Sequence, residues 1–197
     1  MPVRVENLDA ITRELSRVSA LRDGGDQAIA RAVGTLKRRL PAQAKRDIAG
    51  QYALASSKIG SGLRCKGDDS SITLTAVGRT QTLTRFPSRQ TRTGVQAEIQ
   101  KGSPVEIAHA FIRTPTGSAS TSGPQAFIRD AVAGALPADV DFGAVIDHDR
   151  HGYPLVMLTG PSVADMLRNG DREDRLIDFA QTVFAAEVDR QLELANG

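Results

Sequence analysis

The spacing of apolar residues changes twice along this chain, and that change constrains the fold more than any other feature. Near the N-terminus, apolar residues recur every three or four positions, as at Leu8, Ile11 and Leu15, which is typical of an amphipathic helix. In the middle of the chain the spacing becomes two, which is typical of half-buried strands. Towards the C-terminus the helical spacing returns. Helices, then antiparallel strands, then a long helix predict an α+β fold.

The N-terminal helices are expected within about residues 7–56. Asp23-Gly24-Gly25 should end the first helix, because glycine tolerates left-handed geometry, and Asp26 can cap the second. Pro41 lacks an amide hydrogen, so we expect it to kink the second helix or to begin a new one. The glycine-punctuated stretch 58–63 is expected to be a hinge that leads into the sheet region.

A mainly antiparallel sheet is expected over about residues 63–158. Its strands should be 63–66 and 71–77 as a hairpin, 82–86, 94–100, 105–113 with 126–129 as a second hairpin, and 153–158. The small polar stretch 114–124 is expected to be a flexible loop. Within residues 130–150 the pattern favours a short helical turn at 131–136 and a mixed loop at 139–149.

One long C-terminal helix is expected over about residues 162–194, with the whole chain, 1–197, forming a single domain. No run of eighteen apolar residues occurs, and the N-terminus has no apolar stretch typical of a secretion signal, so we expect a cytoplasmic protein. Cys65 is the one cysteine, which excludes an internal disulfide and a cysteine-cluster metal site.

Charge is divided unevenly between the two parts of the chain. Residues 1–113 hold 19 Lys+Arg and 10 Asp+Glu, a balance of +9, whereas residues 114–197 hold 6 and 13, a balance of −7. This division is compatible with head-to-tail packing of identical subunits or with a basic face turned towards nucleic acid. Charged helix faces that are simply solvated explain it equally well.

No motif in the sequence supports catalysis. Asp147-His148-Asp149-Arg150-His151 is the one concentrated titratable cluster, and a zinc site there would need both histidines and a carboxylate. We favour a charged surface loop, because an arginine interrupts the cluster and no helix presents it. Gly60-Ser61-Gly62 lacks the lysine of a phosphate-binding loop, and no nucleophile elbow occurs. We therefore expect no enzyme activity, no cofactor and no metal, and keep a metal-dependent enzyme as the third alternative.

A basic run in the middle of the chain is the best candidate contact surface. Only Glu98 opposes its five cations within 23 residues that are rich in threonine and glutamine. The five are Arg79, Arg85, Arg89, Arg92 and Lys101. Cations with hydroxyl and amide donors suit phosphate contacts without base reading, while the shortage of aromatic residues argues against single-strand stacking. A solvated strand remains the simpler interpretation of the run.

Five short segments form a series along the chain. In order they are residues 5–19, an opening helix; 28–33, an alanine-rich helix; 83–97, an apolar strand and basic residues before Gly-Val; 109–113, His-Ala-Phe-Ile-Arg; and 153–155, a final strand, with 160–166, which begins with Gly-Pro-Ser-Val as a turn into the last helix. Together they resemble the prophage minor tail protein Z family of long-tailed bacteriophages. His109 stands where that family usually has glycine, and residues 114–124 and 130–150 depart from its pattern.

The resemblance implies a structural virion protein that completes the head-proximal end of a long non-contractile tail and helps to join head and tail. The implied partners are further copies of the chain in a ring, as a hexamer or trimer, together with the tail terminator and tail tube proteins. Duplex DNA near the basic run is a further implied contact, and no membrane or small-molecule substrate is implied. The implied location is the virion tail, after assembly in the host cytoplasm. The main alternative is a cytoplasmic, non-specific DNA-binding module that uses the basic half of the chain.

Overall fold

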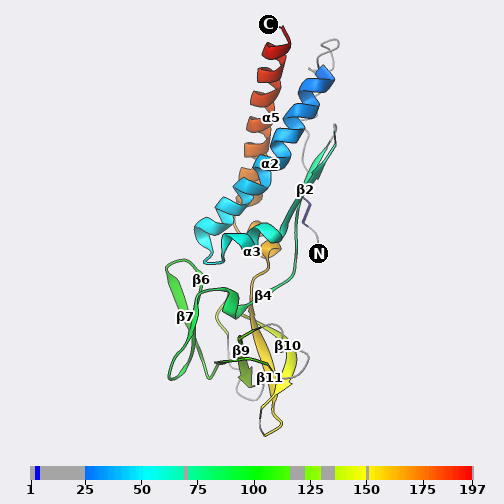
Figure 1. Cartoon of the computed structure of the whole chain (residues 1–197). Coiled ribbons are helices and arrows are strands. Elements are labelled where there is room, and N and C mark those ends of the chain that lie inside the picture. Colours follow the sequence, from blue (N-terminus) through cyan, green and yellow to red (C-terminus); the bar gives the residue numbers. More distant parts are fainter. Residues whose placement is uncertain are drawn as a thin grey trace. The chain divides into compact units, whose positions relative to one another are not determined.

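In the computed structural model of the chain (Figure 1), residues 3–4, 25–68, 71–115, 123–129, 136–149 and 151–196 are described. Their contacts cluster into two compact units. Unit 1 comprises Met1–Ile48, Ile59–Gly78 and Leu167–Gly197, and unit 2 comprises Ala49–Lys58 and Arg79–Met166. Each unit combines stretches that are distant in the sequence. Helices and antiparallel strands make up both units, so the predicted α+β class is confirmed.

Unit 1 contains the two long helices, α2 (Gly25–Gln51), most of which lies in this unit, and α5 (Arg172–Asn196). They lie side by side in Figure 1, and the guanidinium of Arg31 on α2 donates a 2.9 Å hydrogen bond to the side-chain oxygen of Gln191 on α5. Both helices bury an apolar stripe, which includes Leu36 on α2 and Phe184 on α5. The expected helix before Gly24 lies outside the described residues.

Of the two outcomes expected at Pro41, a new helix does not begin there, and the end of α2 also differs from the expectation. The helix continues through Pro41, because Ala44 and Ile48 extend the buried stripe for two more turns. It ends at Gln51, before the expected 56. The hinge expected at 58–63 was largely wrong, because residues Ser56–Ser61 form the short helix α3. Ile59 is fully buried, and this anchor keeps a glycine-punctuated stretch in a defined helical turn.

Unit 1 also contains a three-stranded sheet of order β1-β3-β2. Its strands are β1 (Val3–Arg4), β2 (Leu63–Gly67) and β3 (Ile72–Ala76). The hairpin predicted from the sequence is confirmed, since β2 and β3 pair antiparallel from Leu63 opposite Ala76 to Gly67 opposite Ile72. Ile72, Leu74 and Ala76 are buried while the threonines between them are half-buried, which is the alternation expected for a strand with one covered face.

Unit 2 contains two further sheets. The first is three-stranded, of order β5-β6-β7, with β5 (Ser88–Gln90), β6 (Gly94–Gln100) and β7 (Ser103–Ala108). The second has order β10-β11-β9-β8, with β4 also pairing with β11. Its strands are β4 (Gln81–Thr82), β8 (Phe111–Arg113), β9 (Gln125–Arg129), β10 (Asp141–His148) and β11 (Pro154–Gly160).

Two expectations for unit 2 are corrected. Of the strand expected at 82–86 only Thr82 pairs with β11, opposite Thr159, and Leu83–Arg85 form a short 3-10 helix, η1, instead. The mixed loop expected at 139–149 is wrong, because most of it is β10. Polar Asp141 and Asp147 with Gly143 hide the strand pattern, and two register shifts along β10 disturb it further. The helical turn expected at 131–136 and most of the loop at 114–124 lie outside the described residues.

A second pair of corrections concerns chain breaks. The C-terminal helix expected over 162–194 is two helices, α4 (Val163–Arg168) and α5. Between them Gly170 adopts a φ of 75°, the left-handed conformation with which glycine ends helices. The single strand expected at 105–113 is likewise divided, because β7 pairs with β6 whereas β8 pairs with β9. The hairpin expected between this region and 126–129 therefore involves β8 alone.

His109 makes the break between β7 and β8, with a φ of 62° that favours glycine. Its amide donates a 2.8 Å hydrogen bond to the carbonyl of Thr93, which holds the bend. Replacing His109 with glycine should raise stability by up to about 1 kcal/mol, since relief of left-handed strain exceeds the entropic cost of glycine. Replacing it with valine should lower stability by about 1–2 kcal/mol. Urea unfolding of both variants checks this, and equal midpoints for glycine and valine would contradict it.

Candidate functional site

The five basic residues singled out in the sequence all belong to unit 2, and all five are exposed. Arg79 lies before β4, Arg85 in η1, Arg89 in β5, Arg92 between β5 and β6, and Lys101 between β6 and β7. Arg92 and Lys101 therefore flank opposite ends of β6. A strand of seven residues spans about 23 Å, so the run is spread along this sheet rather than gathered at one point.

Two of these arginines are held by neutral partners. Arg85 donates a 2.7 Å hydrogen bond to the side-chain oxygen of Gln81, and Arg89 donates one of the same length to Gln96. An amide oxygen orients a guanidinium without neutralising its charge. Among the described residues none of the five basic side chains forms a salt bridge, so their positive charge remains available to an outside partner.

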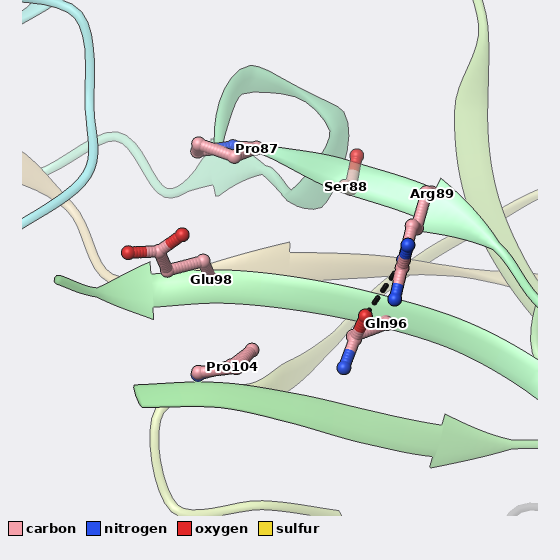
Figure 2. Close-up of a pocket in the computed structure, with 6 residues that line it drawn as sticks. All are labelled: Pro87, Ser88, Arg89, Gln96, Glu98 and Pro104. Atoms are coloured by element: carbon pink, nitrogen blue, oxygen red, sulfur yellow. Dashed lines mark hydrogen bonds between the residues drawn. The ribbon is translucent and has the colours of Figure 1, made fainter. Parts of the chain in front are cut away.

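A pocket of about 330 Å³ lies on the face of the β5-β6-β7 sheet that carries Arg89. Figure 2 shows the Arg89–Gln96 hydrogen bond crossing from β5 to β6, with Pro87 and Pro104 on the flanking segments. The Glu98 carboxylate accepts a 2.8 Å hydrogen bond from the amide of Gly102 and so supports the β6–β7 turn. The pocket combines a cation, an amide and a carboxylate, and it contains no paired acid and base suited to proton transfer.

Glu106 belongs to the same face, although the sequence analysis did not single it out. Strand register sets it opposite Gln96, which in turn lies opposite Arg89, so the three residues follow one another across β7, β6 and β5. The pKa of Glu106 lies below its ordinary value because the hydroxyls of Thr93 and Thr91 donate hydrogen bonds to its carboxylate, and the charge of Arg89 adds to this. Only the pairing of β6 with β7 could have indicated this contact, and residue spacing alone does not encode that pairing.

Gln90 is the second residue that sequence reasoning missed. Its side-chain nitrogen donates to the carbonyls of Gly94 at 2.7 Å and Ala110 at 3.3 Å. Its side-chain oxygen accepts a 2.7 Å hydrogen bond from the amide of Ile112. One glutamine therefore ties the β5-β6-β7 sheet to the first residues of β8. This clamp holds the surface that carries Arg89 and Arg92 in place relative to the second sheet of the same unit.

The acidic cluster near residue 149 has a structural explanation. Asp147 pairs with Arg113 at 3.0 Å and Asp149 with Arg129 at 2.8 Å. Desolvation raises the pKa of Asp149. Hydrogen bonds from the amide of Tyr153, from Arg129 and from the amide of His151 together lower the pKa by more, so the net shift is downward. These carboxylates hold the β10–β11 turn. Within the described residues, no group of three metal-ligating side chains comes together.

The remaining candidates also have local roles. Cys65 is half-buried on β2, and desolvation raises the pKa of its thiol, which disfavours the reactive thiolate. His109 provides the bend between β7 and β8, as described above. Gly60 and Ser61 form part of helix α3, so they do not join a strand to a helix as a phosphate-binding loop requires.

The segment 160–166 shows how a motif from the sequence is used in the fold. A side chain at Gly160 would lie 2.7 Å from the ring of Phe86, so the buried ring would have to shift to admit a larger residue on β11. Ser162 then caps α4: its hydroxyl accepts a 3.1 Å hydrogen bond from the amide of Asp165, whose carboxylate in turn accepts one from the amide of Ser162 at 3.1 Å. This reciprocal arrangement is a capping box.

No family model, curated protein or solved structure matches this chain. Across the described part of the chain, no helix is long and apolar enough to cross a membrane.

Proposed function

We propose that this chain is a non-enzymatic structural protein of a long-tailed bacteriophage virion. It would act as a minor tail protein that completes the head-proximal end of the tail and takes part in joining head and tail. The proposal rests on the five segments that resemble the prophage minor tail protein Z family and on their order along the chain. Each segment is short, so the support comes from finding all five in the same order.

The observation that supports the series best is that three of its positions are constrained by close packing or by backbone conformation. At Gly94 a side chain would lie 2.0 Å from the carbonyl oxygen of Ile107, and at Gly160 it would meet Phe86. At position 109, where the resembling family usually has glycine, the backbone has a φ of 62°. Three positions from separate segments are thus each constrained by the structure of this chain. This is expected if the segments were inherited together from an ancestor with the same fold.

The partners proposed are further copies of the chain in a ring, the tail terminator and the tail tube proteins. Electrostatic complementarity steers such assembly, because an unneutralised surface attracts a partner of opposite sign before contact. Arg85, Arg89 and Arg92 have exposed guanidinium groups without salt bridges in the described part of the chain, which suits them to this role. An acidic protein surface and the DNA that passes through the head–tail junction are both chemically suitable partners for these cations.

Changing Arg85, Arg89 and Arg92 together to glutamine should lower addition of the purified protein to tail tubes about tenfold or more, because three steering charges are lost. Electron microscopy of tubes mixed with protein measures the fraction with density at the head-proximal end. The matched control changes Arg38, Arg46 and Arg64, which are exposed and lie in unit 1, to glutamine, so the net charge falls equally. Tubes without added density for the unchanged protein would sink the tail proposal. An equal loss of tube binding in both triple variants would show that Arg85, Arg89 and Arg92 have no specific role in it.

The alternative is a non-specific duplex-binding module, and the five exposed cations of unit 2, none of which forms a salt bridge among the described residues, are the observation that favours it. It requires the isolated chain to bind duplex DNA with an affinity that falls steeply with salt, since each phosphate contact releases a counterion. Titration of a fluorescent duplex at several salt concentrations separates the two functions. Tight, salt-sensitive binding by the free chain without addition to tail tubes favours the DNA-binding module.

A further inference from the structure

Helix α5 in unit 1 carries a stripe of acidic side chains on its exposed side. The stripe is formed by four exposed carboxylates whose side chains have no salt bridge or hydrogen bond among the described residues. The four are Asp174, Asp178, Asp189 and Glu193. At 3.6 residues per turn they fall within an arc of about 100°, on the side of the helix away from its buried residues. These four residues are called the α5 stripe below.

The α5 stripe consists of two pairs of like charges. The pairs are Asp174 with Asp178 and Asp189 with Glu193. The members of each pair are four positions apart, so they lie side by side on neighbouring turns, and like charges at this spacing destabilise a helix. The exposed arginines of α5 form salt bridges with carboxylates outside the stripe, Arg175 with Asp171 and Arg190 with Glu187. A partner that supplies cations to both pairs therefore stabilises the helix.

The basic run of unit 2 has the opposite charge and a matching length. Residues 79–108 hold five cations and two carboxylates. Arg85, Arg89 and Arg92 follow the chain from η1 through β5 into the turn after it, over a length of up to about 23 Å. The midpoints of the two acidic pairs, at positions 176 and 191, are about 22 Å apart along α5. A helix that lies along β5 can therefore bring one acidic pair to each end of the run.

The exposed face of the β5-β6-β7 sheet is basic on its β5 side. Arg89 lies on this face, as Figure 2 shows, and is exposed. Glu98 and Glu106, the carboxylates described on the same face, belong to β6 and β7, and both already accept hydrogen bonds from neighbouring residues. Between the two acidic pairs of α5, the exposed side of the helix carries Thr182 and Ala186. Their short side chains allow the middle of the helix to approach a sheet closely.

We propose that the basic run of one copy of this chain binds the α5 stripe of the next copy. The partner of Arg85, Arg89 and Arg92 is then a second copy, and this assignment rests on the proposed function, in which copies form a ring. The contact joins unit 2 of one copy to unit 1 of the next, so it uses two different surfaces. A contact of this heterologous kind repeats from copy to copy and closes into a ring where the rotation permits. The opposite charges of the two surfaces fix the direction of assembly and speed the encounter.

The mass of the purified full-length chain, measured by light scattering over a range of concentrations, tests this contact. The mass of the unchanged protein should rise with concentration, and less so at high salt, because exposed charges are screened. Two charge-reversed variants should each associate about tenfold more weakly or less, because their two surfaces repel. One changes Arg85, Arg89 and Arg92 to glutamate, and the other changes Asp178, Asp189 and Glu193 to lysine. The control changes Arg38, Arg46 and Arg64, which are exposed in unit 1, to glutamate and should associate like the unchanged protein.

A mixture of the two charge-reversed variants gives a second readout that a misfolded protein cannot produce. In one variant both surfaces are negative and in the other both are positive, so the mixture should form assemblies in which the variants alternate. A single chain with all six substitutions should also associate again. The proposal is overturned by an unchanged protein that is monomeric at all concentrations, by a mixture that stays monomeric, or by an equal loss of association in the control.

This assay contains no tail proteins, so its failure and the failure of the tail proposal are distinguishable. A chain that stays monomeric but adds to tail tubes through Arg85, Arg89 and Arg92 overturns the contact between copies and leaves the tail function standing. A chain that associates through the α5 stripe but adds to no tail tube supports the contact between copies and contradicts the tail function.

Discussion

Replacing Gly94 with alanine should destabilise the protein by about 3 kcal/mol, because the added methyl group has no space. Its carbon would lie 2.0 Å from the carbonyl oxygen of Ile107 and 2.8 Å from the carbonyl carbon. Both atoms belong to the backbone of β7, opposite Gly94 in the β6–β7 ladder, so no flexible side chain can give way. Thermal and urea unfolding followed by circular dichroism measure the change.

Gly34→Ala is the matched control for this substitution. Gly34 lies inside α2, and a side chain there would meet nothing within 4 Å. Alanine loses less backbone entropy than glycine in a helix, so this variant should be more stable by about 1 kcal/mol. The same chemical change is thus expected to have opposite signs at the two glycines. A Gly94→Ala protein as stable as the unchanged one would show that β6 and β7 do not approach this closely.

The second large effect is expected at Gln90, an exposed residue, where glutamate should destabilise the protein by about 1–2 kcal/mol near neutral pH through the loss of its donated hydrogen bonds. The amide nitrogen of Gln90 donates to the carbonyl oxygens of Gly94 and Ala110. A carboxylate cannot donate, and its charge would face those same oxygens. Gln27→Glu is the control, because Gln27 is exposed in the first turn of α2, where a negative charge is favourable.

The loss at Gln90→Glu should shrink as the pH falls. Carbonyl oxygens beside the new carboxyl disfavour its charged form, so its pKa is raised in the folded protein above the unfolded value near 4.3. Between these two values the folded state binds more protons than the unfolded state, and stability therefore rises as pH falls. Urea unfolding of both proteins between pH 7 and about pH 4 measures the difference. A difference that stays constant over this range would be the contradictory result.

The same sign argument gives the opposite trend for Glu106 in the unchanged protein. Hydrogen bonds from Thr93 and Thr91 hold its folded pKa below the ordinary value of 4.5. Its contribution to stability is present above the unfolded pKa and is lost as pH falls through the lower, folded pKa. The effect of Gln90→Glu is therefore measured as the difference in the free energy of unfolding between the variant and the unchanged protein at each pH. The contribution of Glu106 is common to both proteins and cancels in this difference.

Local patterns in the sequence predicted those helices and strands whose formation depends mainly on residues close together in the chain. The stripe through Leu36 and Leu40 predicted helix α2, and the alternation at Ile72 and Leu74 predicted β3. Such patterns failed where a distant strand decides the outcome. β10 contains Asp141, Gly143 and Asp147 and shows no clean alternation, yet pairing with β11 makes it a strand.

The basic run shows the same limit for the candidate site. Arg85, Arg89 and Arg92, which the sequence singled out as a candidate contact surface, are exposed, because charged side chains in polar stretches stay in water. It did not identify Glu106 or Gln90 as their neighbours. These contacts arise from the register of β5, β6 and β7, and a register is a property of paired strands rather than of one.

By itself, then, the sequence determined the α+β class, the two long amphipathic helices beyond Gly24 and most of the strands. Spacing determines these, because helix and strand periods act over a few residues. Only the tertiary structure decided the division into two units, the three separate sheets and the contacts of Gln90 and Glu106. Those features depend on contacts between segments that are distant in the sequence, and a local pattern of residues does not show which of these contacts are the most stable.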